Sequence, residues 1–279
     1  MKTLIVTDVH GNLPALEAIL ATAEAQACRD VISLGDHTCF CAQSREVHQR
    51  LISLGATLLT GNHEQRLCQA DHPAYAAYNW APMRWTARQL QGLDLHFPTD
   101  LHLGSIHFTH ATPGDPTRLV SPEEMAALLP TLPAGTLLIT GHNHIRWDVR
   151  VGDRRAVNPG SAGLAEDGRG GVAPFAVLDT DDARITLHEA PYRVADTLRA
   201  FITTGMHRSA PEISRAVARV LQTGEYQGVL KLMRHVHQTA TVAGLDPGSQ
   251  AAWRLADASY PWAEPVTSPE YWSQLEESL

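Results

Sequence analysis

The chain has 279 residues, of which 44% are hydrophobic and 19% are charged, a composition typical of globular rather than disordered proteins. Its 22 basic and 30 acidic residues give a net charge of −8, which argues against a nucleic-acid coat protein or a polybasic membrane binder. With fifteen histidines and only four cysteines, the chain raises the question of whether some of the histidines form a metal site.

The first part of the chain alternates between strand and helix patterns. The predicted order is strand 3–7, a helix beginning at Pro14, strand 31–34, helix 46–54 and strand 56–60. This alternation predicts an α/β fold with parallel central strands. A mostly helical stretch follows over about 75–91.

The middle of the chain is rich in short strands. Strands are predicted at 101–103 and 106–109, and the Gly104-Ser105 pair between them is typical of a type II′ hairpin. Further short strands are predicted at 136–140, 146–151, 154–157, 175–179 and 184–189. This part of the sheet structure is therefore expected to be antiparallel or mixed.

The C-terminal part has helical periodicity, with predicted helices at 195–203, 210–223, 228–241 and 250–258. Five aromatic residues lie within the last thirty residues, which indicates packing against the core or against a second subunit. We expect residues 206–279 to form a helical extension that packs on the core or at an interface, where it would support a homo-oligomer.

The sequence also carries expectations about the compartment. The N-terminal apolar run is short and ends at Asp8, unlike a secretory signal, and no window approaches the roughly 18 apolar residues of a membrane span. The four cysteines have neither zinc-ribbon nor disulfide-framework spacing. We therefore expect a cytoplasmic protein.

Residues that can bind metal ions follow five of the predicted strands. The segments are Asp8-Val9-His10, Gly35-Asp36, Gly61-Asn62-His63-Glu64, His110 and Gly141-His142-Asn143-His144. Ligands of open α/β sheets bind beyond the carboxyl ends of the strands, so these segments are expected to converge. Imidazole and carboxylate groups suit Mn²⁺, Fe²⁺ and Zn²⁺, and no thiolate is needed.

All five blocks, in this order, closely resemble the pattern of the calcineurin-like metallophosphoesterase superfamily. Segments 8–18 and 157–161 are most similar to its bacterial branch of diadenosine tetraphosphatase-related or YfcE-like phosphodiesterases. The resemblance covers about residues 1–205, which would form the catalytic domain. It implies an α/β sandwich of two mixed β-sheets flanked by helices.

The resemblance also implies a dinuclear metal site. Asp8, His10, Asp36 and His144 would hold one ion, and Asp36 would bridge to a second ion completed by Asn62, His110 and His142. The ions would be Mn or Fe, with Zn or Ni as alternatives. A hydroxide shared by the ions would attack phosphorus, and His63 would protonate the leaving oxygen.

The expected substrate is a small nucleotide-like phosphodiester or a dinucleoside polyphosphate, with neither a nucleic-acid polymer nor a membrane as partner. His37, Arg66 and Arg118 are candidate substrate contacts, and an ordinary surface position is the alternative for each. A phosphomonoesterase or a Ser/Thr protein phosphatase is the competing enzymatic function. A non-catalytic scaffold is a third possibility, although no expected metal ligand is missing.

Two positions depart from the protein phosphatases of the superfamily. Cys39 stands where those enzymes carry the aspartate that orients the catalytic histidine, and Thr60 stands where they carry an arginine. Both differences argue against a phosphoprotein substrate, and they leave the partner of His63 open.

Overall fold

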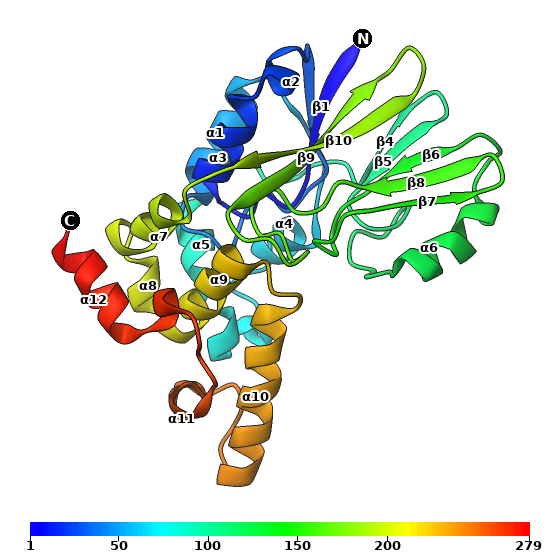
Figure 1. Cartoon of the computed structure of the whole chain (residues 1–279). Coiled ribbons are helices and arrows are strands. Elements are labelled where there is room, and N and C mark those ends of the chain that lie inside the picture. Colours follow the sequence, from blue (N-terminus) through cyan, green and yellow to red (C-terminus); the bar gives the residue numbers. More distant parts are fainter.

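The computed structural model describes residues 1–279 and contains two five-stranded β-sheets (Figure 1). The first sheet has the order β10-β9-β1-β2-β3 and the second has the order β4-β5-β6-β8-β7. The first sheet consists of β1 (Lys2–Val6), β2 (Asp30–Ser33), β3 (Thr57–Leu58), β9 (Val172–Asp179) and β10 (Arg184–Pro191). The second consists of β4 (Asp100–Leu103), β5 (Ile106–Thr109), β6 (Leu137–Ile139), β7 (Trp147–Val151) and β8 (Arg154–Asn158).

Both sheets are mixed, as expected. In the first sheet β1, β2 and β3 are parallel, and β9 pairs antiparallel with β1 and β10. In the second sheet β5, β6 and β8 are parallel, and β4 and β7 pair antiparallel with their neighbours. The carboxyl ends of the parallel strands therefore meet at one edge, where polar loop residues can come together.

The sheets pack face to face through an apolar layer. Ile5 and Ile32 of the first sheet contribute to this layer together with Phe108 and Ile139 of the second. On its outer face the first sheet is covered by α1 (Leu13–Leu20), α2 (Ala23–Gln26) and α3 (Ser44–Ser53), through contacts such as Leu4 with Leu16 in one cluster. Because β1 is buried on both faces, it is apolar at consecutive positions rather than at alternate ones.

Further short helices follow β3 and β5. Those between β3 and β4 connect the two sheets, and those between β5 and β6 pack on the second sheet. They are α4 (Asn62–Leu67), η1 (Pro73–Tyr75), η2 (Tyr78–Trp80), α5 (Ala81–Gln89), α6 (Pro122–Leu128) and η3 (Leu129–Thr131). The sequence did not predict α4 or α6 as separate helices. Both begin with local signals, a capping box between Ser121 and Glu124 in α6 and the Glu64 side chain accepting from the Gly61 N–H in α4.

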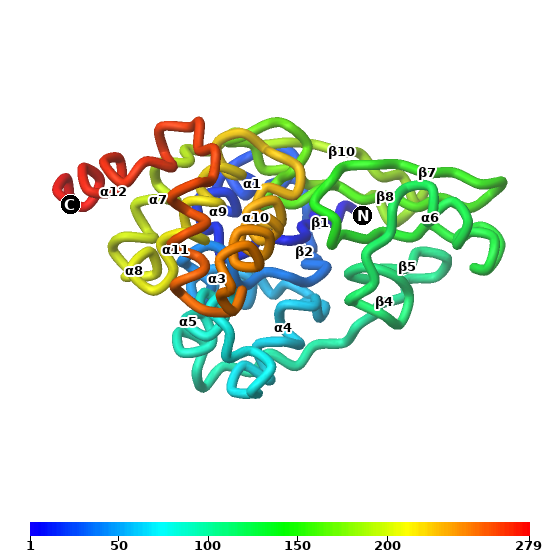
Figure 2. The backbone as a smooth tube through the Cα atoms, turned by 90° about the horizontal axis from the view of Figure 1, so that it is seen from below, coloured from blue at the N-terminus to red at the C-terminus, as the bar shows by residue number.

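The C-terminal helices form a third layer, which lies on the side of the sandwich where the loops gather (Figure 1). They are α7 (Val194–Thr203), α8 (Met206–Ser209), α9 (Pro211–Thr223), α10 (Gly228–Ala243), α11 (Gln250–Ser259), η4 (Pro265–Thr267) and α12 (Pro269–Glu277). Their apolar cluster includes Trp253 and Trp272 and extends to Cys41 and Leu164 of the preceding chain. In the view from below, α10 lies in the centre and is seen nearly end-on (Figure 2). No helix of the chain is both long enough and apolar enough to cross a membrane.

Candidate metal centre

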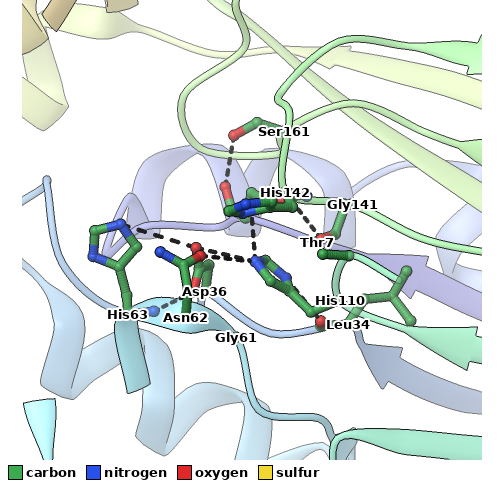
Figure 3. Close-up of polar contacts among 12 residues, drawn as sticks. Thr7, Leu34, Asp36, Gly61, Asn62, His63, His110, Gly141, His142 and Ser161 are labelled. Atoms are coloured by element: carbon green, nitrogen blue, oxygen red, sulfur yellow. Dashed lines mark hydrogen bonds and ion pairs between the residues drawn. The ribbon is translucent and has the colours of Figure 1, made fainter. Parts of the chain in front are cut away.

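Polar side chains from five elements meet at the edge where the parallel strands end. Asp8 follows β1, Asp36 follows β2, Asn62 begins α4, His110 follows β5 and His142 follows β6. Figure 3 shows the side chains of Asp36, Asn62, His110 and His142 directed towards one another. The convergence expected from parallel strand ends is therefore present in the fold.

The backbone at this edge adopts a conformation that residues with a side chain rarely take. Five of the candidate ligands have φ values between +49° and +72°, namely Asp8, His10, Asp36, His142 and His144. Such left-handed residues cost on the order of 1–3 kcal/mol each and occur mainly at functional sites. The strain is held by hydrogen bonds such as that from the His142 N–H to Asp8 Oδ2 (3.0 Å).

Asp8, His10 and His144 form the first cluster, with ligand atoms that all lie within 4.8 Å of one another. The two Nε2 atoms of His10 and His144 are 2.9 Å apart, and His144 Nε2 is 3.4 Å from Asp8 Oδ1. His10 Nδ1 lies 3.1 Å from the Thr38 carbonyl, so a proton there leaves the Nε2 lone pair free. Asp8 Oδ2 accepts from Thr7 Oγ1 (2.5 Å), but Oδ1 is buried without a hydrogen-bond partner. A cation would satisfy that oxygen.

Asp36, His110 and His142 form the second cluster under the same 4.8 Å limit. His110 Nε2 lies 3.2 Å from Asp36 Oδ2, and His110 Nδ1 lies 3.1 Å from the Leu34 carbonyl. The Leu34 carbonyl therefore acts on His110 as Thr38 acts on His10, leaving Nε2 available inside the site.

The side-chain amide of Asn62 adds an oxygen to this cluster. Its Oδ1 lies 3.1 Å from His110 Nε2, and the inward-facing oxygen meets only acceptor atoms. An amide turned by 180° would instead donate hydrogen bonds to Asp36, His110 and His142. An oxygen surrounded by other electron-pair donors is the arrangement expected around a cation. The residues present therefore fit a divalent metal ion.

Electrostatics at the site also favour positive charge. Burial alone lowers the pKa of His110, but the Asp36 and Asp8 carboxylates outweigh it and raise that pKa to about 9. For His144 burial is likewise outweighed, here by Asp8 and Glu166, and its pKa is raised to about 10. These shifts arise because two carboxylates are held close together away from water, a setting that binds cations.

Comparison with known proteins agrees with this geometry. The calcineurin-like phosphoesterase superfamily domain matches residues 1–183 of the chain. The chain belongs to the calcineurin-like phosphoesterase superfamily. It is accordingly a hydrolase of phosphate esters, and its His/Asp clusters indicate divalent metal ions, as the motif order predicted.

The matches with individual relatives cover most of the length of each relative. Phosphodiesterase YfcE of Escherichia coli is 24% identical over 65% of this chain and 89% of the relative, in agreement with the expected branch. An uncharacterised protein of Methanocaldococcus jannaschii is 24% identical over 68% of this chain and 87% of its own. Among solved structures, a metallophosphoesterase from Sphaerobacter thermophilus superposes with a TM-score of 0.66 at 26% identity, covering 78% of this chain and 99% of the other.

In this phosphoesterase, His63 lies at the edge of the two clusters. Its backbone N–H donates to Asp36 Oδ1 (2.8 Å), and its Nε2 lies 4.0 Å from Asp36 Oδ2. The ring packs against Phe40 and His10, with centroids 4.9 and 5.2 Å away. Burial, followed by the charges of His10 and Arg66, lowers the pKa of His63 well below its ordinary value. No carboxylate is hydrogen-bonded to His63 Nδ1, and the ring is held by its packing against Phe40 and His10.

Two glutamates support the site and were not predicted from the sequence. Glu64 is fully buried, and its carboxylate accepts from the backbone N–H groups of Asp36 (2.8 Å) and Gly61 (3.0 Å). Glu166 Oε1 lies 3.5 Å from His144 Nδ1, while Oε2 accepts from the Gln227 N–H (2.7 Å). Glu64 belongs to the Gly61-Asn62-His63-Glu64 motif, so its supporting role could have been predicted from the sequence. Glu166 has no local motif, and only the fold brings it to His144.

The segment 157–161, which supported the choice of branch, braces the same centre. Asn158 Nδ2 donates to the Gly141 carbonyl (2.7 Å), and Ser161 Oγ donates to the Asp8 carbonyl (2.7 Å; Figure 3). Gly61 and Gly141 are required by close approach, because a Cβ atom would lie 2.1 Å from Asp36 Oδ1 and 2.0 Å from Thr7 Oγ1 respectively. These residues hold the ligand-bearing loops without contributing ligand atoms themselves.

The three candidate substrate contacts are placed differently. Arg66 lines the cavity described below, with its guanidinium over the Trp80 ring at 5.7 Å. Arg118 is exposed and does not line that cavity. His37 is fully buried behind the centre, where its Nε2 lies 3.2 Å from His48 Nδ1 and its Nδ1 lies 3.5 Å from Glu64 Oε1. Of the three, only Arg66 lines the cavity.

A cavity of about 570 Å³ extends from the metal centre to the C-terminal helices. At one end it is bounded by Asp36, Asn62, His63, His142 and His144. At the other end lie five apolar residues from α9, α10 and α11, which we call the helical wall: Ile213, Val229, Leu230, Met233 and Trp253. The predicted catalytic domain and the predicted C-terminal extension thus both contribute residues to the cavity.

Proposed function

We propose that this chain is a dinuclear metal-dependent phosphodiesterase whose two ions lie at the two clusters. Asp8, His10 and His144 would hold one ion, Asp36 would bridge, and Asn62, His110 and His142 would complete the second. Two such ions supply a hydroxide at neutral pH and neutralise phosphate oxygens. One observation carries this proposal. Asp8 Oδ1 is buried without a hydrogen-bond partner, and it lies near the Nε2 atoms of His10 and His110. The Nδ1 atoms of both histidines face backbone carbonyls, which leaves the two Nε2 atoms free for a metal ion.

His63 is proposed to protonate the leaving oxygen. It lies beside the bridging carboxylate, and its side chain is 14% exposed at the cavity. Its buried Nδ1 has no hydrogen-bond partner, so this ring nitrogen is not engaged in a structural hydrogen bond. An anionic phosphate at the site would offset the burial that lowers the pKa of His63 and would favour its protonated, donating form.

The proposed substrate is a small nucleotide-like phosphodiester or a dinucleoside polyphosphate. The name of the YfcE relative favours the diester class, and Thr60 and Cys39 argue against a phosphoprotein. Mn or Fe are the proposed metals, with Zn or Ni as alternatives, because all four accept imidazole and carboxylate ligands. We further propose a cytoplasmic location, a catalytic unit of residues 1–205, and residues 206–279 as an extension through which copies associate.

The test combines metal content with turnover. We expect about two divalent ions per chain by plasma mass spectrometry after Mn²⁺ reconstitution, and hydrolysis of bis(p-nitrophenyl) phosphate that chelators abolish. His63→Ala should keep both ions while an alkyl diester is hydrolysed about 10²–10⁴-fold more slowly. His96→Ala, at a histidine whose side chain is 83% exposed, is the matched control and should change neither quantity.

An inert protein with no stoichiometric metal would refute the dinuclear site. Equal alkyl-ester rates before and after His63→Ala, with both ions present, would refute the proton-donor role alone.

A further inference from the structure

The cavity beside the metal centre is mainly apolar beyond the centre itself. Fourteen of its 28 lining residues are hydrophobic, and they come from segments far apart in the chain. Leu119 and Val120 precede α6, Trp80 and Met83 belong to η2 and α5, and the helical wall belongs to α9, α10 and α11. A volume of about 570 Å³ lies in the range of small-molecule sites, so the cavity is large enough for a sizeable organic group.

The wall contributed by α10 is directed into the cavity by helical spacing. Leu230 and Met233 are three residues apart and therefore lie on one face of the helix. Leu230 is 45% exposed although it is a large aliphatic residue that lines the cavity. An apolar ligand group would cover this surface, which water contacts at present.

Charged side chains in the cavity are few and mostly acidic. Arg66 is the only lysine or arginine that lines it, whereas Glu124 and Glu166 line it together with Asp36 of the centre. Glu166 also bridges His144 to the first turn of α10 through the Gln227 N–H, so its position follows from the fold. Beyond the metal centre, a chain of phosphates would meet two carboxylates and a single guanidinium.

From this lining we infer that the substrate carries one phosphodiester group whose non-leaving substituent is a bulky apolar group that occupies the cavity against the helical wall. The inference rests on the proposed function and sharpens its substrate class. It favours a monophosphate diester over a dinucleoside polyphosphate, because each further phosphate would add negative charge beside Glu124 and Glu166 without a matching cation. Each methylene fully buried against the wall should strengthen binding about fourfold.

The kinetic test uses two substrates that share a leaving group. Hexyl p-nitrophenyl phosphate and methyl p-nitrophenyl phosphate differ only in the group proposed to enter the cavity. With the Mn²⁺-reconstituted full chain we expect kcat/KM to be at least about tenfold higher for the hexyl ester. Equal values, or a preference for the methyl ester, would overturn the inference and leave the phosphodiesterase proposal intact.

A binding test does not depend on turnover. Hexylphosphonate should bind at least about tenfold more tightly than methylphosphonate in isothermal titration calorimetry, with a more negative heat-capacity change. Equal affinities would overturn the apolar cavity site. Preferential binding of hexylphosphonate by a protein that hydrolyses neither ester would refute the proposed function while supporting the cavity assignment.

Two substitutions on α10 place the effect on the wall. Leu230→Glu should reduce the hexyl-to-methyl ratio of kcat/KM at least about fivefold, because it brings a carboxylate into the apolar surface. Val242→Glu makes the same change on the same helix at a residue that is 91% exposed and does not line the cavity, and the ratio should be unchanged. An equal fall in both variants, or none in Leu230→Glu, contradicts the assignment.

Diadenosine tetraphosphate tests the exclusion of polyphosphates. We expect its kcat/KM to lie at least about tenfold below that of the hexyl ester, since the cavity lining offers one arginine against two glutamates. A value above that of the hexyl ester would overturn the inferred substrate class.

Discussion

At the metal centre the side chains are polar, mostly buried and held by strained backbone, whereas the helical wall is apolar and partly exposed. Asp8 and His110 are each 0% exposed, while Leu230 is 45% exposed. The chemistry of the centre depends on charged side chains held away from water, and these side chains can move little without losing their partners. The wall offers shape and apolar area, which can change with less effect on the fold. The proposals above accordingly assign the reaction to the centre and the substrate preference to the wall.

The largest effect is expected at the centre. Asp36→Asn removes the charge of the proposed bridging ligand with little change of shape. We expect metal stoichiometry to fall and kcat/KM to drop by more than the ~10–100-fold typical of outer-shell changes. Asp30→Asn, at an exposed residue that begins β2, the strand before Asp36, is the control for both assays. If Asp36→Asn kept both ions and full activity, Asp36 would not be a required ligand, and the centre would be no more sensitive to substitution than the wall.

The next effect is expected in the helical layer, on stability. Leu232 is fully buried on α10, and Leu232→Ala should lower the free energy of unfolding by about 2–5 kcal/mol, measured by urea denaturation. Val242→Ala on the same helix should stay within about 0.5 kcal/mol of the parent because the residue is 91% exposed. A negligible effect of Leu232→Ala would mean that α10 is not packed on the rest of the chain.

Glu166 links the two regions, and its substitution should have an intermediate effect. Glu166→Gln keeps an oxygen for the Gln227 N–H but weakens the interaction with His144 Nδ1. Metal affinity or kcat should fall about 10–100-fold. Glu17→Gln, in a half-exposed surface pair with Arg50, should leave both unchanged. Parent-like metal affinity and turnover in Glu166→Gln would show that His144 is positioned without it.

The smallest effect is expected on the outer surface, away from both regions. Arg155 donates to Asp148 at 2.9 and 2.7 Å, and this pairing lowers the pKa of the carboxyl. Because the folded pKa lies below the unfolded one, the stabilisation is full above the unfolded pKa and is lost as the pH falls through the folded value.

Asp148 is 39% exposed, so Asp148→Asn should cost less than about 1 kcal/mol near pH 7. The cost should shrink as the pH falls below the ordinary carboxyl pKa of 3.8 and vanish once the folded-state carboxyl is protonated, measured by chemical denaturation. A cost that increases on acidification would contradict this sign.

Much of the α/β core could be predicted because local pattern and tertiary environment agree there. The run Leu4-Ile5-Val6 is apolar at consecutive positions, and the structure buries it on both faces of β1. Element ends were shifted by a few residues, as at β3, which spans Thr57–Leu58 rather than 56–60. The helix α12 was not predicted, although Ser268 caps it and Pro269 begins it, which are local signals that the sequence contains.

For the centre, the sequence alone placed the candidate ligands after strand ends, and physical chemistry then required them to meet. It could not place His37, which turns away from the cavity towards His48 because the bend at Asp36 directs it behind the centre. Nor could it identify Glu166 or Leu230 as neighbours of the site. Leu230 reaches the site because the C-terminal helices pack beside the strand-end loops, whereas Glu166 lies beside His144 because the loop after β8 folds against the loop after β6, where the Glu166 N–H donates to the His144 carbonyl (3.2 Å).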